Sequence, residues 1–197
     1  MHNPQLLPPN LPVPQDDGAA RHLLGQALPA VELPGTDGAI HDLSRLSGRH
    51  VLFFYPRTGV PGQPPNRGFH GEDWDDIPGA RGCTPQNCAF RDDHAAFAAL
   101  GVTVWGVSTQ TTQHQEEFRQ RNHVPFHALS DQHLHLVRAL NLPTFEFPVE
   151  SGGPNTLIKR MGWFVEDARI QHVWYPVFPP NQHATVVLAW LRQHLGR

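Results

Sequence analysis

Two long apolar runs constrain the fold more than any other feature of the chain. HVLFFYP at 50–56 ends in a proline, and VTVWGVST at 102–109 is a second run of the same kind. Apolar runs without alternation are typical of strands that are buried on both faces of a sheet. The segment from about 84 to 100 lies between them and has a helical pattern, with Phe90 and Phe97 on one face. Strand, helix and strand in this order predict the core of an α/β sheet.

The flanking segments extend this core to a mixed sheet with helices on both faces. Two short strands around a glycine-containing turn are expected at 31–46, and a hairpin is expected from strands at 156–165 and 168–176. Helices are expected in three more segments: 112–122, 132–141 and 183–194. Ser130 or Asp131 is the expected N-cap of the helix at 132–141.

The N-terminal segment and one internal segment lack any periodicity. Five prolines fall within the first 14 residues, which predicts a flexible or polyproline-like arm at 1–24 ahead of a folded domain at 25–197. Residues 57–79 are rich in proline and glycine and predict a long inserted loop, a kind of segment that often carries function. Phe69 and Trp74 in this loop either cover a functional site or pack on the surface.

The charge and composition argue against several classes of protein. Fifteen basic residues stand against 18 acidic ones, and the net charge of −3 gives no electrostatic basis for binding nucleic acid or an anionic membrane. The apolar runs are too short to span a bilayer, and the N-terminus lacks the features of a signal peptide. The 14 histidines form no metal-ligand pattern, so no metal is expected. No other cofactor is expected either. These features predict a cytoplasmic protein.

Both cysteines lie within the segment GARGCTPQNCAFRD at 79–92, and two are too few for a disulfide framework or a structural zinc site. With Thr84 as the N-cap and Pro85 as the first helical residue, Cys83 sits just before a helix. The free N–H groups and the positive end of the helix dipole favour its thiolate form there. Cys88 then lies inside the first turns and is unreactive at rest. From the spacing alone, a redox pair and a stray thiol beside a small core residue are equally open.

The spacing of the two thiols sets a geometric condition on any disulfide between them. Residues five apart in a regular helix are displaced by about 7.5 Å along the axis and roughly 140° around it, which places their Cα atoms about 8 to 9 Å apart. A disulfide requires a Cα separation of about 4.4 to 6.8 Å. A bond between Cys83 and Cys88 would therefore require the first turn of the helix to unwind.

The order of motifs along residues 28–192 resembles the peroxiredoxins, in particular the bacterioferritin-comigratory or Q-type branch. The resemblance rests on FFYPRTG, GCTPQNCAFRDDHAAF, GVTVWGVSTQ, FHALSD, LIKRMGWFVEDARIQHVWY and VLAWL. Its most specific piece is G-C-T-x-x-x-C-x-F-R-D. The resemblance implies a thioredoxin-like α/β fold, in which helices flank a mixed central sheet, with an N-terminal β-hairpin extension. It also implies thiol-dependent reduction of hydrogen peroxide and organic hydroperoxides.

The resemblance also implies roles for individual residues. Cys83 matches the peroxidatic cysteine, and Cys88 matches the resolving cysteine of members that form the disulfide within one helix. Arg160 matches the arginine that orients the thiolate and the peroxide. Pro56 matches the proline that ends the first core strand and shields the site. The implied cycle is that of an atypical two-cysteine enzyme, with an intramolecular Cys83–Cys88 disulfide that a thioredoxin-like dithiol reduces.

One departure from the family pattern concerns a threonine. The family carries Pro-x-x-x-Thr-x-x-Cys, and its threonine hydroxyl bonds both the thiolate and the peroxide. Here Ala80 stands three residues before Cys83, because the loop 57–79 is inserted after the strand. Thr58 in YPRTG is the expected replacement. Thr84 is the weaker alternative because it also serves as a cap.

Two other functions stay open at the level of the sequence. A non-catalytic thioredoxin-fold redox sensor or adaptor would use the same cysteine pair without turnover, and the missing threonine favours it. A general thiol–disulfide oxidoreductase would act without peroxide, although the spacing is not the C-x-x-C of such reductases. For the peroxidase, the expected partners are a hydroperoxide and a dithiol reductant, and the expected assembly is a monomer or weak dimer.

Overall fold

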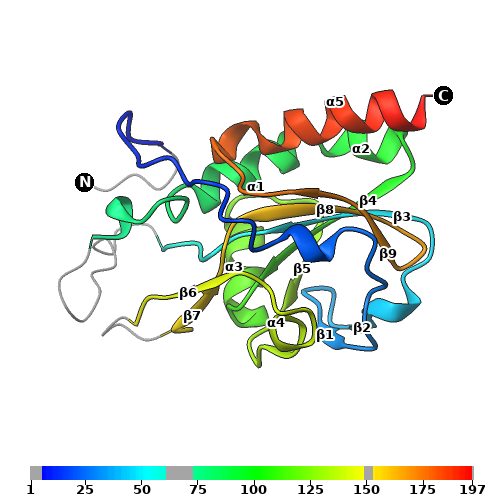
Figure 1. Ribbon diagram of the computed structural model, residues 1–197, viewed down its shortest axis with the longest axis horizontal. Coiled ribbons are helices and arrows are strands. Elements are labelled where there is room, and N and C mark those ends of the chain that lie inside the picture. Colours follow the sequence, from blue (N-terminus) through cyan, green and yellow to red (C-terminus); the bar gives the residue numbers. More distant parts are fainter. Residues whose placement is uncertain (1–5, 61–72, 149–152, 197) are drawn as a thin grey trace.

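A mixed five-stranded sheet forms the centre of the protein (Figure 1). The computed structural model describes residues 6–60, 73–148 and 153–196. The strands in spatial order are β5 (His127–Ser130), β4 (Val102–Ser108), β3 (Arg49–Phe54), β8 (Met161–Glu166) and β9 (Arg169–Trp174). The first three run parallel, whereas β8 is antiparallel to both β3 and β9. With its flanking helices, this sheet confirms the predicted thioredoxin-like α/β fold.

Helices and small sheets cover the two faces of this sheet (Figure 1). On one face lie α1 (Cys83–Asp92), α2 (His94–Ala99) and α5 (His183–Leu195). On the other lie α4 (His135–Leu140) and the predicted N-terminal hairpin of β1 (Glu32–Pro34) and β2 (Ile40–Asp42). The remaining elements are α3 (Thr112–Arg121), the strand pair β6 (Thr144–Glu146) and β7 (Thr156–Ile158), and the 3-10 turns η1 (Arg21–Leu23), η2 (Leu43–Arg45), η3 (Trp74–Asp76) and η4 (Pro180–Gln182). No helix in the described ranges has the length and apolarity to cross a bilayer.

Strand β3 separates two hydrophobic clusters, because successive side chains of a strand point to opposite faces. Leu52 and Phe54 belong to the cluster beneath α4 and the N-terminal hairpin. Val51 and Phe53 belong to the cluster beneath α1, α2 and α5. Cys83 is a member of this second cluster, so the thiol sits at the edge of a packed core and not on an open surface.

The predicted helix over about 84–100 is divided in two. It leaves helical geometry at Asp93, where α1 ends and α2 begins. Short polar side chains such as those of Asp92 and Asp93 compete with the backbone for hydrogen bonds, which favours a break at this point. Phe90 and Phe97 nevertheless pack together as predicted, with their ring centroids 5.4 Å apart.

Two further boundaries differ from the sequence prediction. The segment 156–165 is not one strand, because β7 pairs with β6 and the chain then bends through Lys159 and Arg160 into β8. The helix predicted at 132–141 begins only at His135. The N-cap is Leu134, so the predicted N-cap at Ser130 or Asp131 was wrong. The Asp131 carboxylate nevertheless accepts hydrogen bonds from the N–H groups of Leu136 and Val137 in the first turn, at 3.1 and 2.9 Å.

The N-terminal arm and the inserted loop both have described parts. Residues 6–24 run against the body of the protein and include the buried side chain of Leu23 in η1. Of the loop 57–79, the structure describes 57–60 and 73–79, and Phe69 lies outside the described residues. Trp74 is buried against Phe145 and Phe147, in a cluster separate from that of the cysteine. The division of the chain at residue 24 stays a prediction.

Candidate active site

Helix α1 begins at the cysteine itself. Gly82 is the N-cap with φ of +106°, and the first intrahelical bond runs from the N–H of Gln86 to the carbonyl of Gly82 at 3.0 Å. The N–H groups of Cys83 and Thr84 precede that bond and lie at the positive end of the helix dipole. The expected N-cap was therefore wrong by two residues, since Thr84 is the second helical residue and makes no capping bond.

A glycine is required at the helix start for two reasons. L-residues with a side chain rarely adopt so positive a φ. In addition, a Cβ atom at position 82 would lie 2.3 Å from Cγ of Pro180 and 2.8 Å from Cδ2 of Leu7. The turn that presents Cys83 is thus clamped between the N-terminal arm and η4.

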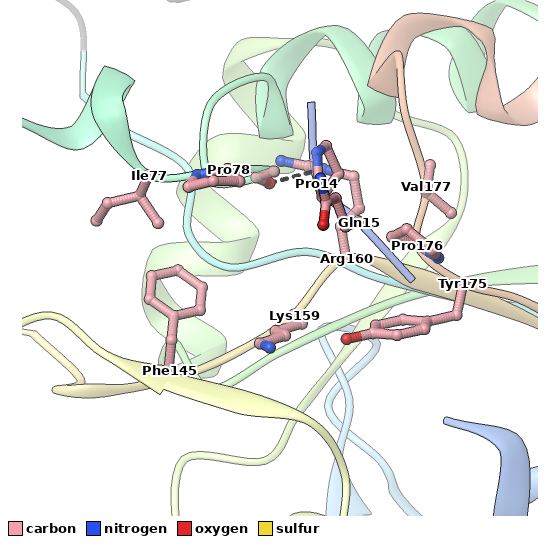
Figure 2. Close-up of a pocket in the computed structure, with 11 residues that line it drawn as sticks. Pro14, Gln15, Ile77, Pro78, Phe145, Lys159, Arg160, Tyr175, Pro176 and Val177 are labelled. Carbon is pink, nitrogen blue, oxygen red and sulfur yellow. Dashed lines mark hydrogen bonds between the residues drawn. The ribbon is translucent and has the colours of Figure 1, made fainter. Parts of the chain in front are cut away.

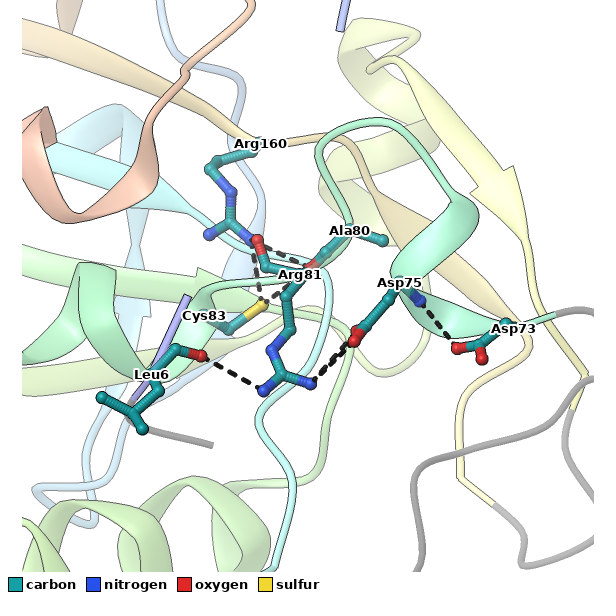
Figure 3. Close-up of polar contacts among 7 residues, drawn as sticks. All are labelled: Leu6, Asp73, Asp75, Ala80, Arg81, Cys83 and Arg160. Atoms are coloured by element: carbon teal, nitrogen blue, oxygen red, sulfur yellow. Dashed lines mark hydrogen bonds and ion pairs between the residues drawn. The ribbon is translucent and has the colours of Figure 1, made fainter. Parts of the chain in front are cut away.

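A buried arginine contacts the Cys83 sulfur (Figure 3). The Nη2 atom of Arg160 lies 3.2 Å from Sγ of Cys83, and both side chains are only 3% exposed. The carbonyl oxygen of Ala80 lies 3.6 Å from the same sulfur and accepts from Arg160 Nη2 at 3.0 Å. Arg160 also donates to the carbonyls of Gly79 and Arg81 at 3.3 Å each. The chain bend between β7 and β8 therefore holds the guanidinium against the loop that leads into α1.

Two buried polar side chains hold the other edge of this guanidinium. Arg160 Nη1 donates to Oε1 of Gln86, and Gln86 Nε2 donates to Nδ1 of His183 at 2.9 Å. Burial, followed by the charge of Arg160, lowers the pKa of His183 to about 3. The ring is therefore neutral, and the proton is on Nε2 because Nδ1 accepts. Gln86 and His183 thus orient the arginine without adding a competing charge.

Sequence reasoning missed both supporting residues and one further arginine. Gln86 lies one helical turn after Cys83, so its i, i+3 spacing was a usable signal. No local pattern connects His183 at the start of α5 with this site. The further arginine is Arg57, which follows Pro56. Burial lowers the pKa of Arg57, and the electrostatic interaction with the Cys83 sulfur partly opposes this effect.

Cys88 lies five residues further along the same helix and is half-buried. Burial raises the pKa of its thiol, an effect that the nearby Arg91 partly offsets. The thiol is therefore protonated at rest. Both cysteines are free and both lie within α1, so the geometric condition on a disulfide applies as predicted.

The remaining predicted site residues are Pro56, Thr58 and Thr84. Pro56 is buried two residues after the end of β3, and its role in shielding the site stays a prediction. Thr58 is buried too, but its hydroxyl bonds Gln110 and His114 at 3.2 Å each, and the described contacts do not bring it to Cys83. Thr84 lies next to the cysteine. Within the described ranges, no group of three or more His, Cys, Asp or Glu side chains is placed to hold a metal ion.

Fold and site together define a class: a thioredoxin-like protein that holds a buried cysteine on the first residue of a helix, next to an arginine. The Redoxin family profile matches residues 23–188, and the chain belongs to that family. Its relatives confirm the resemblance to the Bcp and Q peroxiredoxins.

Three relatives show the extent of the similarity. Peroxiredoxin Bcp of Escherichia coli (strain K12) is 27% identical over 175 residues, which is 86% of this chain and 96% of that protein. Peroxiredoxin Bcp of Bacillus subtilis (strain 168) is 31% identical over 120 residues, 60% of this chain and 64% of the relative, so less than two thirds of the relative is covered. The crystal structure of peroxidoxin BcpB from Mycobacterium tuberculosis superposes with a TM-score of 0.64 at 25% identity, covering 86% of this chain and 96% of that one.

Proposed function

We propose that the protein is a thiol peroxidase that uses Cys83 to reduce hydroperoxides. The observation that carries the proposal is the 3.2 Å contact between Arg160 and a buried thiol at the first residue of a helix. The guanidinium and the N-terminal end of the helix place positive charge beside the sulfur, which is the setting of a nucleophilic cysteine. The same groups are placed to stabilise negative charge on a peroxide oxygen. The names of the relatives support this chemistry.

In the proposed reaction, the Cys83 thiolate attacks the distal oxygen of a hydroperoxide in line with the O–O bond. The O–O bond breaks, an S–O bond forms, and the remaining oxygen leaves as an alcohol or water after taking up a proton. Cys83 is thereby oxidised to a sulfenic acid. The Cys88 sulfur then attacks the sulfenic sulfur, a disulfide forms and water leaves. A thioredoxin-like dithiol reduces the disulfide by exchange.

In this proposal, other donors replace the hydroxyl of the family threonine. Ala80 has no hydroxyl, and the Thr58 hydroxyl is bonded to Gln110 and His114. The N–H groups of Cys83 and Thr84, together with Arg160, remain as donors for a peroxide oxygen. The proposal therefore does not need a threonine hydroxyl next to the sulfur.

The test is peroxide consumption by the reduced protein, with dithiothreitol and with a thioredoxin system as reductants. We expect turnover in the wild type, none in Cys83→Ser, and a single oxidation without thioredoxin-supported turnover in Cys88→Ser. Sustained activity in Cys83→Ser would exclude the proposal. A single stoichiometric oxidation of the wild type would instead support the redox sensor, which the absence of a threonine at position 80 favours.

We also propose a cytoplasmic protein that acts as a monomer or weak dimer. Gel filtration of both redox forms over a range of concentrations tests the assembly.

A further inference from the structure

Leu6 of the N-terminal arm lies beside the candidate active site (Figure 3), although nearly all of the arm precedes the segment that matches the family. The carbonyl of Leu6 accepts from Arg81 Nη2 at 3.2 Å, and the carbonyl of the same Arg81 accepts from Arg160. The side chain of Leu7 lies over the helix start at Gly82. Pro14 lies over Gly79, whose carbonyl also bonds Arg160.

Asp17 anchors the arm to the body of the protein through two side chains. Asp17 Oδ2 pairs with Nζ of Lys159 at 2.8 Å, and Asp17 Oδ1 accepts from the hydroxyl of Tyr175 at 2.8 Å. The hydrogen bond from Lys159, ahead of the other contributions, lowers the pKa of Asp17 to about 2. Lys159 directly precedes Arg160, so the arm is attached to the same chain bend that carries the guanidinium.

A pocket of about 250 Å³ lies between the arm and the body (Figure 2). Pro14 and Gln15 of the arm form one wall, and Ile77, Phe145 and Val177 provide apolar surface from the body. Arg160 lines the same pocket and also contacts the Cys83 sulfur at 3.2 Å. Arg160 is therefore shared between the lining of the pocket and the surroundings of the reactive sulfur.

We infer that this arm-walled pocket receives the organic group of a hydroperoxide, and that the arm is a specificity-determining part of the site. The inference rests on the proposed peroxidase function. A group in the pocket would place its peroxide end toward Arg160 and the thiol. The lining is mostly apolar, and the charge of Lys159 is already neutralised by Asp17, so the pocket suits a small alkyl or aryl group better than an anion. Hydrogen peroxide has no such group and gains nothing from the pocket.

The test compares two hydroperoxides in full-length variants of the arm. Asp17→Ala removes both anchoring contacts. Asp16→Ala is the matched control, because the Asp16 carboxylate accepts only the local bond from the N–H of Gly18 among the described contacts. Rapid quench and mass spectrometry give the second-order rate constant for oxidation of Cys83 by hydrogen peroxide and by cumene hydroperoxide. We expect Asp17→Ala to lose at least tenfold with cumene hydroperoxide and less than threefold with hydrogen peroxide, and Asp16→Ala to behave as the wild type.

A second variant and a binding measurement guard against misfolding and against failure of the peroxidase itself. Ile77→Trp fills the pocket from the body and should show the same selective loss. Binding of cumyl alcohol, the product, to the reduced protein is followed by NMR and should weaken in both variants. If both variants change the two rate constants by equal factors, or change neither, the pocket does not hold the organic group. If the wild type reduces neither peroxide, the proposed function fails, whereas alcohol binding that depends on Asp17 would still support the pocket.

Discussion

Arg160 donates a hydrogen bond to the sulfur of Cys83 at 3.2 Å, although 77 positions separate the two residues in the sequence. The sheet order brings them together. β8 pairs with β3 in antiparallel register, with Met161 opposite Phe54, so the chain bend before β8 lies at the same end of the sheet as the loop after β3. That loop leads to the start of α1. The polar contact is therefore a direct consequence of the strand arrangement, and it yields the first prediction.

Substituting Arg160 by methionine removes the guanidinium and keeps a side chain of similar length. We expect oxidation of Cys83 by hydrogen peroxide to slow by about 10²- to 10³-fold, because removing one preorganised donor to developing charge typically has that effect. Rapid-quench kinetics measure the rate, and circular dichroism checks the fold. Arg49→Met is the matched control, since Arg49 forms an exposed ion pair with Glu166 at the far end of β3. An unchanged rate in Arg160→Met would show that the arginine plays no part in the oxidation.

The buried His183 predicts a pH dependence of stability. Its pKa is lowered from 6.5 to about 3 in the folded protein, so between these values the unfolded chain binds a proton that the folded protein does not. Stability therefore falls as the pH drops below about 6.5, and this one group removes about 2 kcal/mol at pH 5. Urea unfolding at pH 7 and pH 5 measures the change.

The contribution of His183 is isolated by substitution. His183→Asn lowers stability at pH 7 through lost packing, but it should show a smaller further loss at pH 5 than the wild type. The exposed His133 supplies the control, and His133→Asn should keep the full pH dependence. An equal pH dependence in wild type and His183→Asn would contradict a neutral buried ring.

Much of the fold was predictable because strand and helix periodicity report directly on burial. The runs at 50–56 and 102–109 became β3 and β4, and the closing helix became α5. The short strands β5 and β6 were missed, whereas the equally short β1 and β2 were predicted because a glycine-containing turn lies between them. Three or four residues give little periodic signal without such a turn.

Some residues of the candidate site were likewise predictable from the sequence, and others were not. Cys83 and Cys88 were identifiable from spacing and helix signals, and Arg160 from resemblance. Gln86 was missed although its i, i+3 spacing from Cys83 was a usable signal. His183 was not found because its contact with α1 spans 97 positions. The contribution of the N-terminal arm was also missed, since a proline-rich segment was interpreted as flexible and its docking rests on single side chains such as Asp17.

Gly82→Ala tests how tightly the helix start is clamped. The added Cβ meets Pro180 at 2.3 Å and Leu7 at 2.8 Å, and the positive φ adds backbone strain. We expect a loss of about 2 to 4 kcal/mol in the free energy of unfolding. Gly101→Ala is the matched control, because Gly101 also has a positive φ but open space around its Cβ position, so only the strain of about 1 to 2 kcal/mol applies. Equal losses in the two variants would mean that the contacts with Pro180 and Leu7 do not matter.

The last prediction concerns the helix between the two cysteines. Because Cys83 and Cys88 both lie in α1, their Cα atoms are about 8 to 9 Å apart and a disulfide requires local unwinding. Unwinding the first turns would release Phe90, which stacks on Phe53 with a centroid distance of 4.2 Å. The reduced form should therefore be the more stable one.

Tryptophan fluorescence offers a first view of this change. Phe90 contacts the ring of His183, which in turn contacts Trp174, whereas Trp74 lies in a separate cluster. Trp174 is therefore the expected reporter, and its replacement by phenylalanine should remove the redox-dependent signal. A signal that persists in Trp174→Phe but disappears in Trp74→Phe would place the rearrangement on the loop side of the site.

Amide hydrogen exchange on the two redox forms decides the question. Cys83 and Cys88 must be verified by mass spectrometry as the disulfide in one sample and as free thiols in the other. We expect protection over residues 84–90 to fall sharply on oxidation, while α5 changes less because Val187, Leu188 and Leu191 belong to a hydrophobic cluster that extends well beyond α1. Cys88→Ser exposed to one equivalent of peroxide separates the effect of the sulfenic acid from that of the disulfide. Equal protection across 84–90 in both verified forms would contradict the unwinding of the helix on oxidation.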